Sequence, residues 1–430
     1  MRIALYNSLG RMLAASLMVM NVWACSSSPT AVPVPSPNVS QGPAADVAPR
    51  WNAIARGLIV AAKPNQQEAL RMLAYLSLGQ HEASLEIKQA YSPVFGSAQG
   101  LTSESTEIVS SGVQSGNSGT RRDDAAQLRG AIAGASAEIL TEWFKSSGAS
   151  VRAALDAEAL ASAEAGEIAE QFQLGVTEGR RVGARIAAAA RIDNFDSAWD
   201  GVMPTGPGKW FSSIGRPPVL PVLGKMKPFY MKTGADFRPG PPPALGSNAF
   251  TSALAEIRQY SDTRTAAQDS TAKFWAMATG TLVAGYWNEV ATSLIAKYHL
   301  NEQRATHLLA LMNTAAMDGN IACHDAKYTY WMIRPSQADA GIKTAIGLPN
   351  HPSYPSNHAC LSGTAALVLA NQFPAEKAQL EQQAEDATVS RYYAGLHYRF
   401  DGDSGLVIAK NVAALALKVD RDLSGRLSLR

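Results

Sequence analysis

The 430-residue chain has only three cysteines and almost no net charge. Three cysteines are too few for a disulfide scaffold, and they lack the spacing of a structural zinc site. A formal net charge of +2 argues against a nucleic-acid partner and against a polybasic membrane contact. Any strong positive potential in this protein must therefore be local.

The apolar run near the start, residues 12–22, is shorter than the ~20 residues that a membrane span needs. Two arginines precede this run and a small residue, Ala24, stands near its end, which is the layout of an export signal over residues 1–24. The four residues that end at Cys25 resemble a lipobox, so we expect Cys25 to be lipidated; cleavage after Ala24 without lipidation is the alternative. Either way we expect the protein to be exported to the periplasm; with lipidation, the lipid anchor is its only expected membrane contact.

Residues 25–50, rich in Ser, Pro, Val and Ala, predict a flexible tether. From residue 51 apolar side chains recur at three- and four-residue intervals among Ala, Leu, Glu and Gln, which predicts an all-α fold. We expect an N-terminal helical region with long loops over 51–247 and a C-terminal helical domain over 248–430. The helical pattern covers 51–61, 66–91, 124–146, 150–192, 248–260, 266–298, 301–328 and 359–373.

Two stretches interrupt the helical pattern. Residues 94–121 are rich in Ser, Gly and Thr, and residues 203–247 are dense in Pro and Gly, so both are expected to be long loops. Loops of this length are either functional covers or disordered insertions, and composition leaves that choice open.

One segment of the chain is similar to another. Residues 51–74 and 287–310 align without gaps and share ten of twenty-four positions, including the pairs Trp51-Asn52 and Trp287-Asn288. Shared composition of two Ala-rich helices explains part of this identity, but it does not explain the paired Trp-Asn. We interpret the similarity as an ancient duplication that gives two related helical bundles.

Basic residues, histidines and a carboxylate concentrate in three blocks near the C-terminal end. The blocks are, in order, Lys327-x6-Arg334-Pro335, Pro355-Ser356-Asn357-His358 and Ser390-Arg391-x5-His397-x3-Asp401. Three cations can neutralise a phosphate-like trianion, with the guanidinium groups suited to bidentate contacts. On a continuous helix Lys327 and Arg334, which are two turns apart, project from one face. The blocks therefore predict a site for a tetrahedral oxyanion.

The second block stands where a helix begins. Ser356 and Asn357 precede an apolar helical run, and a helix N-terminus offers free backbone N–H groups to an anion. In the third block His397 and Asp401 are one helical turn apart or face each other across a short loop. A carboxylate bonded to one ring nitrogen leaves the other nitrogen to bind phosphorus or vanadium. His358 is then placed to act as acid and base.

The three blocks resemble the signature of the type 2 phosphatidic acid phosphatase and vanadium haloperoxidase superfamily. The resemblance is closest over 265–415, and it implies an all-helical fold with the active site in the core of a bundle. It assigns oxyanion binding to four residues, acid–base catalysis to His358, the bond to phosphorus or vanadium to His397 and orientation of that ring to Asp401. The four oxyanion binders are Lys327, Arg334, Ser356 and Arg391. Asn357 stands where the family usually has Gly, and its backbone N–H can still donate to the anion.

The resemblance leaves two reactions open. A haloperoxidase holds vanadate as its cofactor and oxidises halide with hydrogen peroxide, whereas an acid phosphatase uses the same pocket, without a cofactor, to hydrolyse a phosphomonoester through a phosphohistidine. The long helical N-terminal half and His351, at the place of a halide-side histidine, favour the haloperoxidase-like branch. The short spacing between His358 and Ser390 favours a compact phosphatase. A non-catalytic oxyanion-binding lipoprotein is the remote alternative.

Two other interpretations concern the remaining histidines and cysteines. A zinc site built from His324, His351, His358 and His397 competes with the oxyanion site, but cationic neighbours disfavour a divalent metal. Cys323 and Cys360 each lie close to a motif residue, so a disulfide between them is an alternative to two buried free thiols. We favour the free thiols, because cysteine is often a small buried apolar residue.

Overall fold

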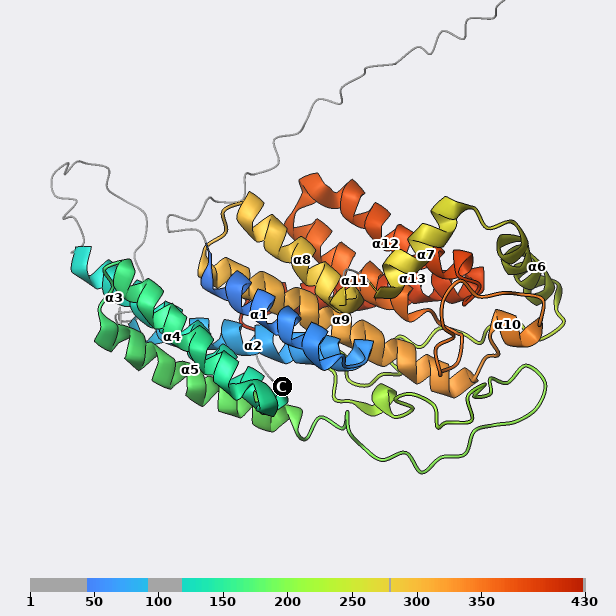
Figure 1. The fold of residues 1–430 in the computed structure, drawn as a ribbon, viewed down its shortest axis with the longest axis horizontal. Coiled ribbons are helices and arrows are strands. Elements are labelled where there is room, and N and C mark those ends of the chain that lie inside the picture. The colour runs from blue at the N-terminus through green and yellow to red at the C-terminus, as the bar shows by residue number, and fades with distance from the viewer. Residues whose placement is uncertain (1–44, 92–117, 278–279, 428–430) are drawn as a thin grey trace, which may run out of the picture. The chain divides into compact units, whose positions relative to one another are not determined.

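The computed structural model describes residues 45–91, 118–277 and 280–427. The expected export signal, Cys25, the tether up to residue 44 and most of the loop at 94–121 lie outside the described residues. The described chain contains thirteen α-helices and, apart from one isolated bridge between Lys209 and Met332, no β-structure (Figure 1). This confirms the predicted all-α fold.

The N-terminal half forms five helices. They are α1 (Val47–Ala62), α2 (Gln66–Tyr91), α3 (Ser118–Trp143), α4 (Gly148–Glu164) and α5 (Ala169–Ala190). The continuous helix expected at 150–192 is wrong, because the chain turns at Gly166, whose φ of 72° ends α4. Helix α1 begins before residue 51 because the Glu302 carboxylate accepts hydrogen bonds from the backbone N–H groups of Asp46, at 2.7 Å, and Val47, at 2.6 Å. A cap from so distant a residue leaves no local signal in the sequence.

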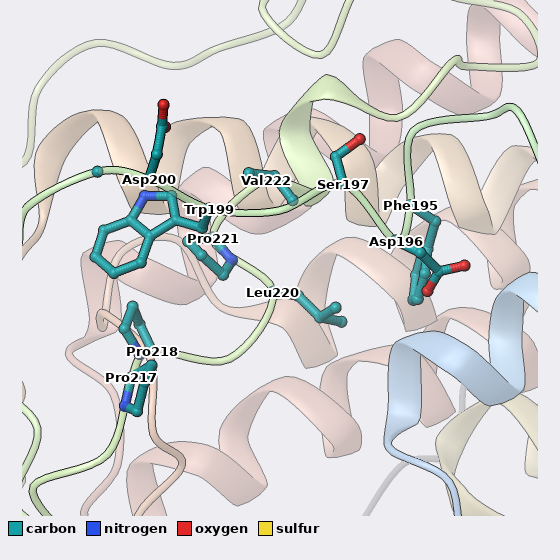
Figure 2. Close-up of a pocket in the computed structure, with 11 residues that line it drawn as sticks. Phe195, Asp196, Ser197, Trp199, Asp200, Pro217, Pro218, Leu220, Pro221 and Val222 are labelled. Atoms are coloured by element: carbon teal, nitrogen blue, oxygen red, sulfur yellow. The ribbon is translucent and has the colours of Figure 1, made fainter.

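A long irregular segment connects α5 to α6 (Asn248–Thr263), and its only helical turn is η2 (Leu223–Lys225). The Asp318 carboxylate holds this segment against α9 by accepting from the backbone N–H groups of Phe229, at 2.7 Å, and Tyr230, at 2.8 Å. Figure 2 shows residues that line a pocket in this segment, among them three prolines, two aromatic rings and two aspartates. The pocket has a volume of about 590 Å³. The stretch 203–247 is therefore an ordered cover on α9.

The C-terminal half contains the remaining helices, and α9 is the longest. They are α6, α7 (Ala266–Met277), α8 (Leu282–Lys297), α9 (Glu302–Tyr330), α10 (Pro335–Ala338), α11 (Asn357–Gln372), α12 (Lys377–Tyr393) and α13 (Arg399–Asp422). The expected helix 266–298 is two helices, α7 and α8. Helices α12 and α13 were not among the expected ones, and both pack against α11.

The two similar segments, residues 51–74 and 287–310, form equivalent helices that contact each other. Helices α2 and α9 begin at equivalent positions of the alignment, Gln66 and Glu302. Equivalent residues also contact each other: Asn52 Nδ2 donates to Asn288 Oδ1 at 2.7 Å. The pairs α1–α2 and α8–α9 therefore contact each other through residues that are equivalent in the alignment.

The capping of α1 and α8 follows the same relationship. Glu302 accepts from the Val47 N–H at the start of α1, and its equivalent Gln66 accepts from the Val283 N–H at the start of α8, at 2.8 Å. Each helix pair thus caps the other. Only the second pair continues into the three motif blocks.

Candidate active site

Lys327 lies in the last turn of α9 and is fully buried. Its ammonium group donates to the carbonyl oxygens of Pro352 at 2.9 Å, of Ser353 at 2.7 Å and of Pro355. Burial lowers the pKa of Lys327 to about 8, and the nearby Arg334 acts in the same direction. Lys327 therefore shapes the loop that leads into α11 and places a positive charge beneath it.

Arg334 is not on the same helix as Lys327, so the shared face that a continuous helix would give the two residues does not apply. Helix α9 ends at Tyr330, and Trp331 has a φ of 55° in the left-handed region. The available signal was Pro335, because a residue before proline avoids helical dihedrals. Arg334 instead begins α10, and its guanidinium is fully buried.

The buried guanidinium of Arg334 joins the loop before α11 to the turn before α13. It donates through Nε to the His351 carbonyl at 3.0 Å and through Nη1 to the Leu396 carbonyl at 2.9 Å. The same Nη1 lies 3.4 Å from His397 Nε2. Burial lowers the pKa of Arg334 to about 10, so the group is still charged at neutral pH. Because a guanidinium only donates, Nε2 of His397 is the acceptor and carries no proton.

Ser356 is the N-cap of α11, as predicted, but its side chain makes no capping hydrogen bond. Its Oγ is buried and has no hydrogen-bond partner among the described residues. A buried hydroxyl without a partner calls for an explanation, and an anion at the helix start supplies one. Helix α13 passes close by at Gly405, where a Cβ atom would meet the Ser356 carbonyl at 2.9 Å. This close approach helps to fix the first turn of α11.

His397 and Asp401 have neither of the two expected arrangements: they are not on one helix, and they do not face each other across a loop. His397 stands in the turn between α12 and α13, and Asp401 is in the first turn of α13. Asp401 Oδ2 accepts from His397 Nδ1 at 2.8 Å and from Ser353 Oγ at 2.5 Å. Burial raises the pKa of Asp401 to about 7, opposed by the hydrogen bond from Ser353 and by the charge of Lys327. The proton on Nδ1 leaves Nε2 of His397 as the free nucleophile or ligand.

His358 and Arg391 are both held by backbone carbonyls of α7. His358 Nε2 donates to the Trp275 carbonyl at 2.9 Å, and Arg391 Nη2 donates to the Ala272 carbonyl at 2.8 Å. Burial, with Arg391 nearby, keeps the pKa of His358 well below its ordinary value. A neutral ring with its proton on Nε2 has an unprotonated Nδ1 for acid–base work. Sequence reasoning missed this role of α7, because main-chain acceptors leave no residue pattern.

His351 lies beside Arg334, with its Nδ1 accepting from Nη2 at 3.1 Å. The ring of His324 stands 5.9 Å from that of His351, between centroids. Among the described residues, no group of three or more His, Cys, Asp or Glu side chains is placed to hold a metal ion. The four histidines of the zinc interpretation therefore do not converge on one cation. Cys323 and Cys360 are both free and buried.

The site brings together three buried cations, one carboxylate, two histidine ring nitrogens without protons and an unpaired hydroxyl. The cations are Lys327, Arg334 and Arg391, and burial lowers the pKa of each. Gathering uncompensated positive charge in the core is costly unless an anion balances it. The donor set fits vanadate as well as phosphate: Arg334, Arg391 and Ser356 for the oxygens and His397 Nε2 for the central atom. Lys327 contributes its charge, because its three N–H groups donate to backbone carbonyls.

Comparisons with known proteins bear on the fold. No protein-family profile matches the sequence. The structure resembles a crystal structure described as the first bacterial vanadium-dependent iodoperoxidase, with a TM-score of 0.67, 21% sequence identity and coverage of 88% of this chain and 97% of that one. It also resembles an apo-type bacterial vanadium-dependent chloroperoxidase, with a TM-score of 0.62, 12% identity and coverage of 83% and 93%.

A curated protein is similar in sequence as well. A non-specific acid phosphatase from Providencia stuartii is 28% identical over 122 residues, which is 27% of this chain and 49% of that protein. The match thus spans about half of the phosphatase. The chain has the fold of the bacterial vanadium-dependent haloperoxidases. Together the relatives fit the superfamily of type 2 phosphatidic acid phosphatases and vanadium haloperoxidases.

Proposed function

We propose that this protein is a vanadium-dependent haloperoxidase that oxidises halide with hydrogen peroxide. The observation that carries the proposal is that the likeness to the iodoperoxidase structure spans 97% of that chain, including both helical halves. The buried cation cluster supplies what a vanadate cofactor needs for binding. His351, adjacent to Arg334, is the candidate for the halide side.

Each residue has a distinct task in this proposal. Lys327, Arg334 and Arg391 neutralise the anion, and Ser356 Oγ donates to one of its oxygens. His397 Nε2 holds the central atom, because Asp401 keeps the proton on Nδ1. Vanadate, when bound, activates peroxide toward attack by halide. His358 moves the proton that this reaction requires through its Nδ1, because its Nε2–H donates to the Trp275 carbonyl.

Acid phosphatase activity is the second candidate, and the sequence similarity to the Providencia stuartii enzyme favours it. In this reaction the substrate anion offsets the charge of Arg391, which lets His358 take up a proton at Nδ1. His397 Nε2 then attacks phosphorus while the bond to the leaving oxygen breaks, and His358 gives that oxygen its proton. A water molecule, deprotonated by His358, then attacks the phosphohistidine and releases phosphate. The same cations stabilise the charge on the phosphoryl oxygens in both steps.

One experiment separates the two candidates. Purified protein is assayed for p-nitrophenyl phosphate hydrolysis, then loaded with vanadate and assayed for bromide and iodide oxidation by peroxide. Halide oxidation that depends on vanadate, with negligible hydrolysis, supports the haloperoxidase. Hydrolysis that vanadate inhibits, without halide oxidation, supports the phosphatase. Tight phosphate binding without either reaction identifies a non-catalytic binding protein.

We further propose that the chain is exported to the periplasm and lipidated at Cys25. The support is the layout of residues 1–25 alone. Among the described residues, no helix has the length and apolar character needed to span a membrane. Mass spectrometry of the mature N-terminus tests the proposal: an acylated Cys25 supports it, and an unmodified chain that still begins at Met1 contradicts it.

A further inference from the structure

Asn357, the first residue of α11, makes two contacts with buried groups on α9. Its Oδ1 lies 2.8 Å from Cys323 Sγ, and its Nδ2 lies 3.0 Å from His324 Nε2. Cys323 and His324 are fully buried, and Asn357 is 8% exposed. The amide of Asn357 is thus clamped between a thiol and an imidazole.

The amide of Asn357 can bond its two partners in either orientation. Burial lowers the pKa of His324 to about 3, so its ring is neutral and has one donor and one acceptor nitrogen. In one orientation the Cys323 thiol donates to the amide oxygen and the amide nitrogen donates to His324 Nε2. In the flipped orientation His324 Nε2–H donates to the oxygen and the amide nitrogen donates to Cys323 Sγ. In both cases Cys323 and His324 together hold both ends of the amide.

The position of the clamp connects it to the anion site. Cys323 lies one helical turn before Lys327 on α9, and Asn357 stands between Ser356 and His358. An asparagine at a helix start commonly turns its side chain back onto nearby backbone N–H groups. Those N–H groups are the ones a bound oxyanion uses. With both ends of its amide held by Cys323 and His324, the side chain of Asn357 does not compete with the anion.

We propose that Asn357 is a positioning residue whose clamp by Cys323 and His324 keeps the first turn of α11 open to an oxyanion. The clamp also fixes the peptide groups that carry Ser356 and His358. The inference rests on the oxyanion site of the proposed function. It assigns a task to three buried groups that neither proposed reaction employs.

The test measures phosphate and vanadate binding by calorimetry in the full chain. Asn357→Ala removes both contacts that fix the first turn of α11 and is expected to raise the Kd about tenfold, the equivalent of about 1.4 kcal/mol. Cys323→Ala and His324→Leu remove one side of the clamp each and are expected to raise the Kd about threefold to tenfold. Cys323→Ser keeps a donor and His324→Gln keeps an acceptor, so both are expected to bind nearly as the parent does.

Asn313→Ala is the matched control. Asn313 is a buried amide on α9 that donates to Ser77 Oγ at 3.0 Å and contacts none of the motif residues. This variant is expected to lower the melting temperature and leave the phosphate Kd unchanged. A merely structural role for Asn357 predicts the same result for Asn357→Ala.

The outcomes separate this inference from the proposed function. If the parent protein binds neither phosphate nor vanadate, the proposed function fails. If the parent binds phosphate but Asn357→Ala binds it equally well, the clamp has no effect on the anion and the inference is overturned. Equal loss of binding in the Cys323→Ser and Cys323→Ala variants, and in the two His324 variants, also overturns it, since packing rather than hydrogen bonding is then responsible.

Discussion

Asp401 and His397 form the buried pair around which the site is built, with Oδ2 of the carboxylate 2.8 Å from Nδ1 of the ring. Ser353 Oγ and the Tyr398 N–H donate to the same Oδ2, at 2.5 and 3.3 Å, so the carboxylate has a fixed orientation. At the opposite edge of the ring, Nε2 lies 3.4 Å from Nη1 of Arg334. The ring is therefore fixed in both orientation and tautomer before any anion binds.

Asp401→Asn is expected to reduce kcat by about 10²–10⁴, because the amide does not supply the charge that stabilises the histidine in the transition state. The relevant measurement is turnover of whichever substrate the parent accepts. Asp403→Asn is the matched control, since Asp403 is exposed on the same turn of α13. A variant at position 401 with near-normal kcat contradicts the role given to this pair.

His397 and His358 are expected to differ in what their loss removes. His397→Ala should abolish turnover, since the nucleophile or ligand is gone. His358→Ala should keep phosphate binding within about threefold and lower kcat by about 10²–10⁴. Calorimetry and steady-state kinetics on the two variants distinguish the roles. Loss of phosphate binding in folded His358→Ala protein would show that His358 binds the anion instead.

Much of the fold follows from helical periodicity, and the exceptions have local causes. Periodicity predicted most helices but merged α4 with α5, although Gly166 was visible as a breaker. The extension of α1 to Val47 depends on Glu302, more than two hundred residues away, so no local pattern could indicate it. The paired Trp-Asn of the alignment was a usable signal, since its two asparagines, Asn52 and Asn288, are hydrogen-bonded to each other in the structure.

The motif residues of the site were predictable, but their surroundings were not. The three blocks supplied every side chain proposed to touch the anion, because charged and histidine side chains leave a pattern in the sequence. The Trp275 and Ala272 carbonyls leave none, since any residue has one. Ser353 was within the Pro-rich run before α11, but only the structure shows its hydroxyl on Asp401.

Anion affinity is expected to fall above pH 8. Burial lowers the pKa of Lys327 to about 8, so the protein without anion loses this proton above that pH, whereas a bound anion holds the ammonium charged. Binding then takes up a proton, and the phosphate Kd should rise about tenfold per pH unit. Calorimetry between pH 7.5 and about 9.5, where phosphate is a dianion, measures the slope. A flat profile contradicts the assigned pKa.

The same lysine has the opposite effect on the stability of the protein without anion. In the unfolded chain Lys327 keeps its ordinary pKa of 10.5, so between about pH 8 and that value the unfolded state binds more protons than the folded state. The contribution of Lys327 to the free energy of unfolding therefore rises with pH through this window. Urea unfolding of the parent and of Lys327→Met across the window isolates it: the difference between the two should vary with pH in the parent's favour.

The Asn288 network is expected to contribute strongly to stability without affecting the site. Asn288 Oδ1 accepts from Asn52 Nδ2 at 2.7 Å and from Asn313 Nδ2 at 2.9 Å, and all three residues are buried. Asn288→Leu leaves both donors without that acceptor, which should lower the free energy of unfolding by about 2–4 kcal/mol. Thr292→Val, one turn further along α8 and half-buried, is the control and should cost about 1 kcal/mol or less. Chemical unfolding measures both, and an unchanged midpoint for Asn288→Leu would show that the contact between the related helix pairs does not hold them together.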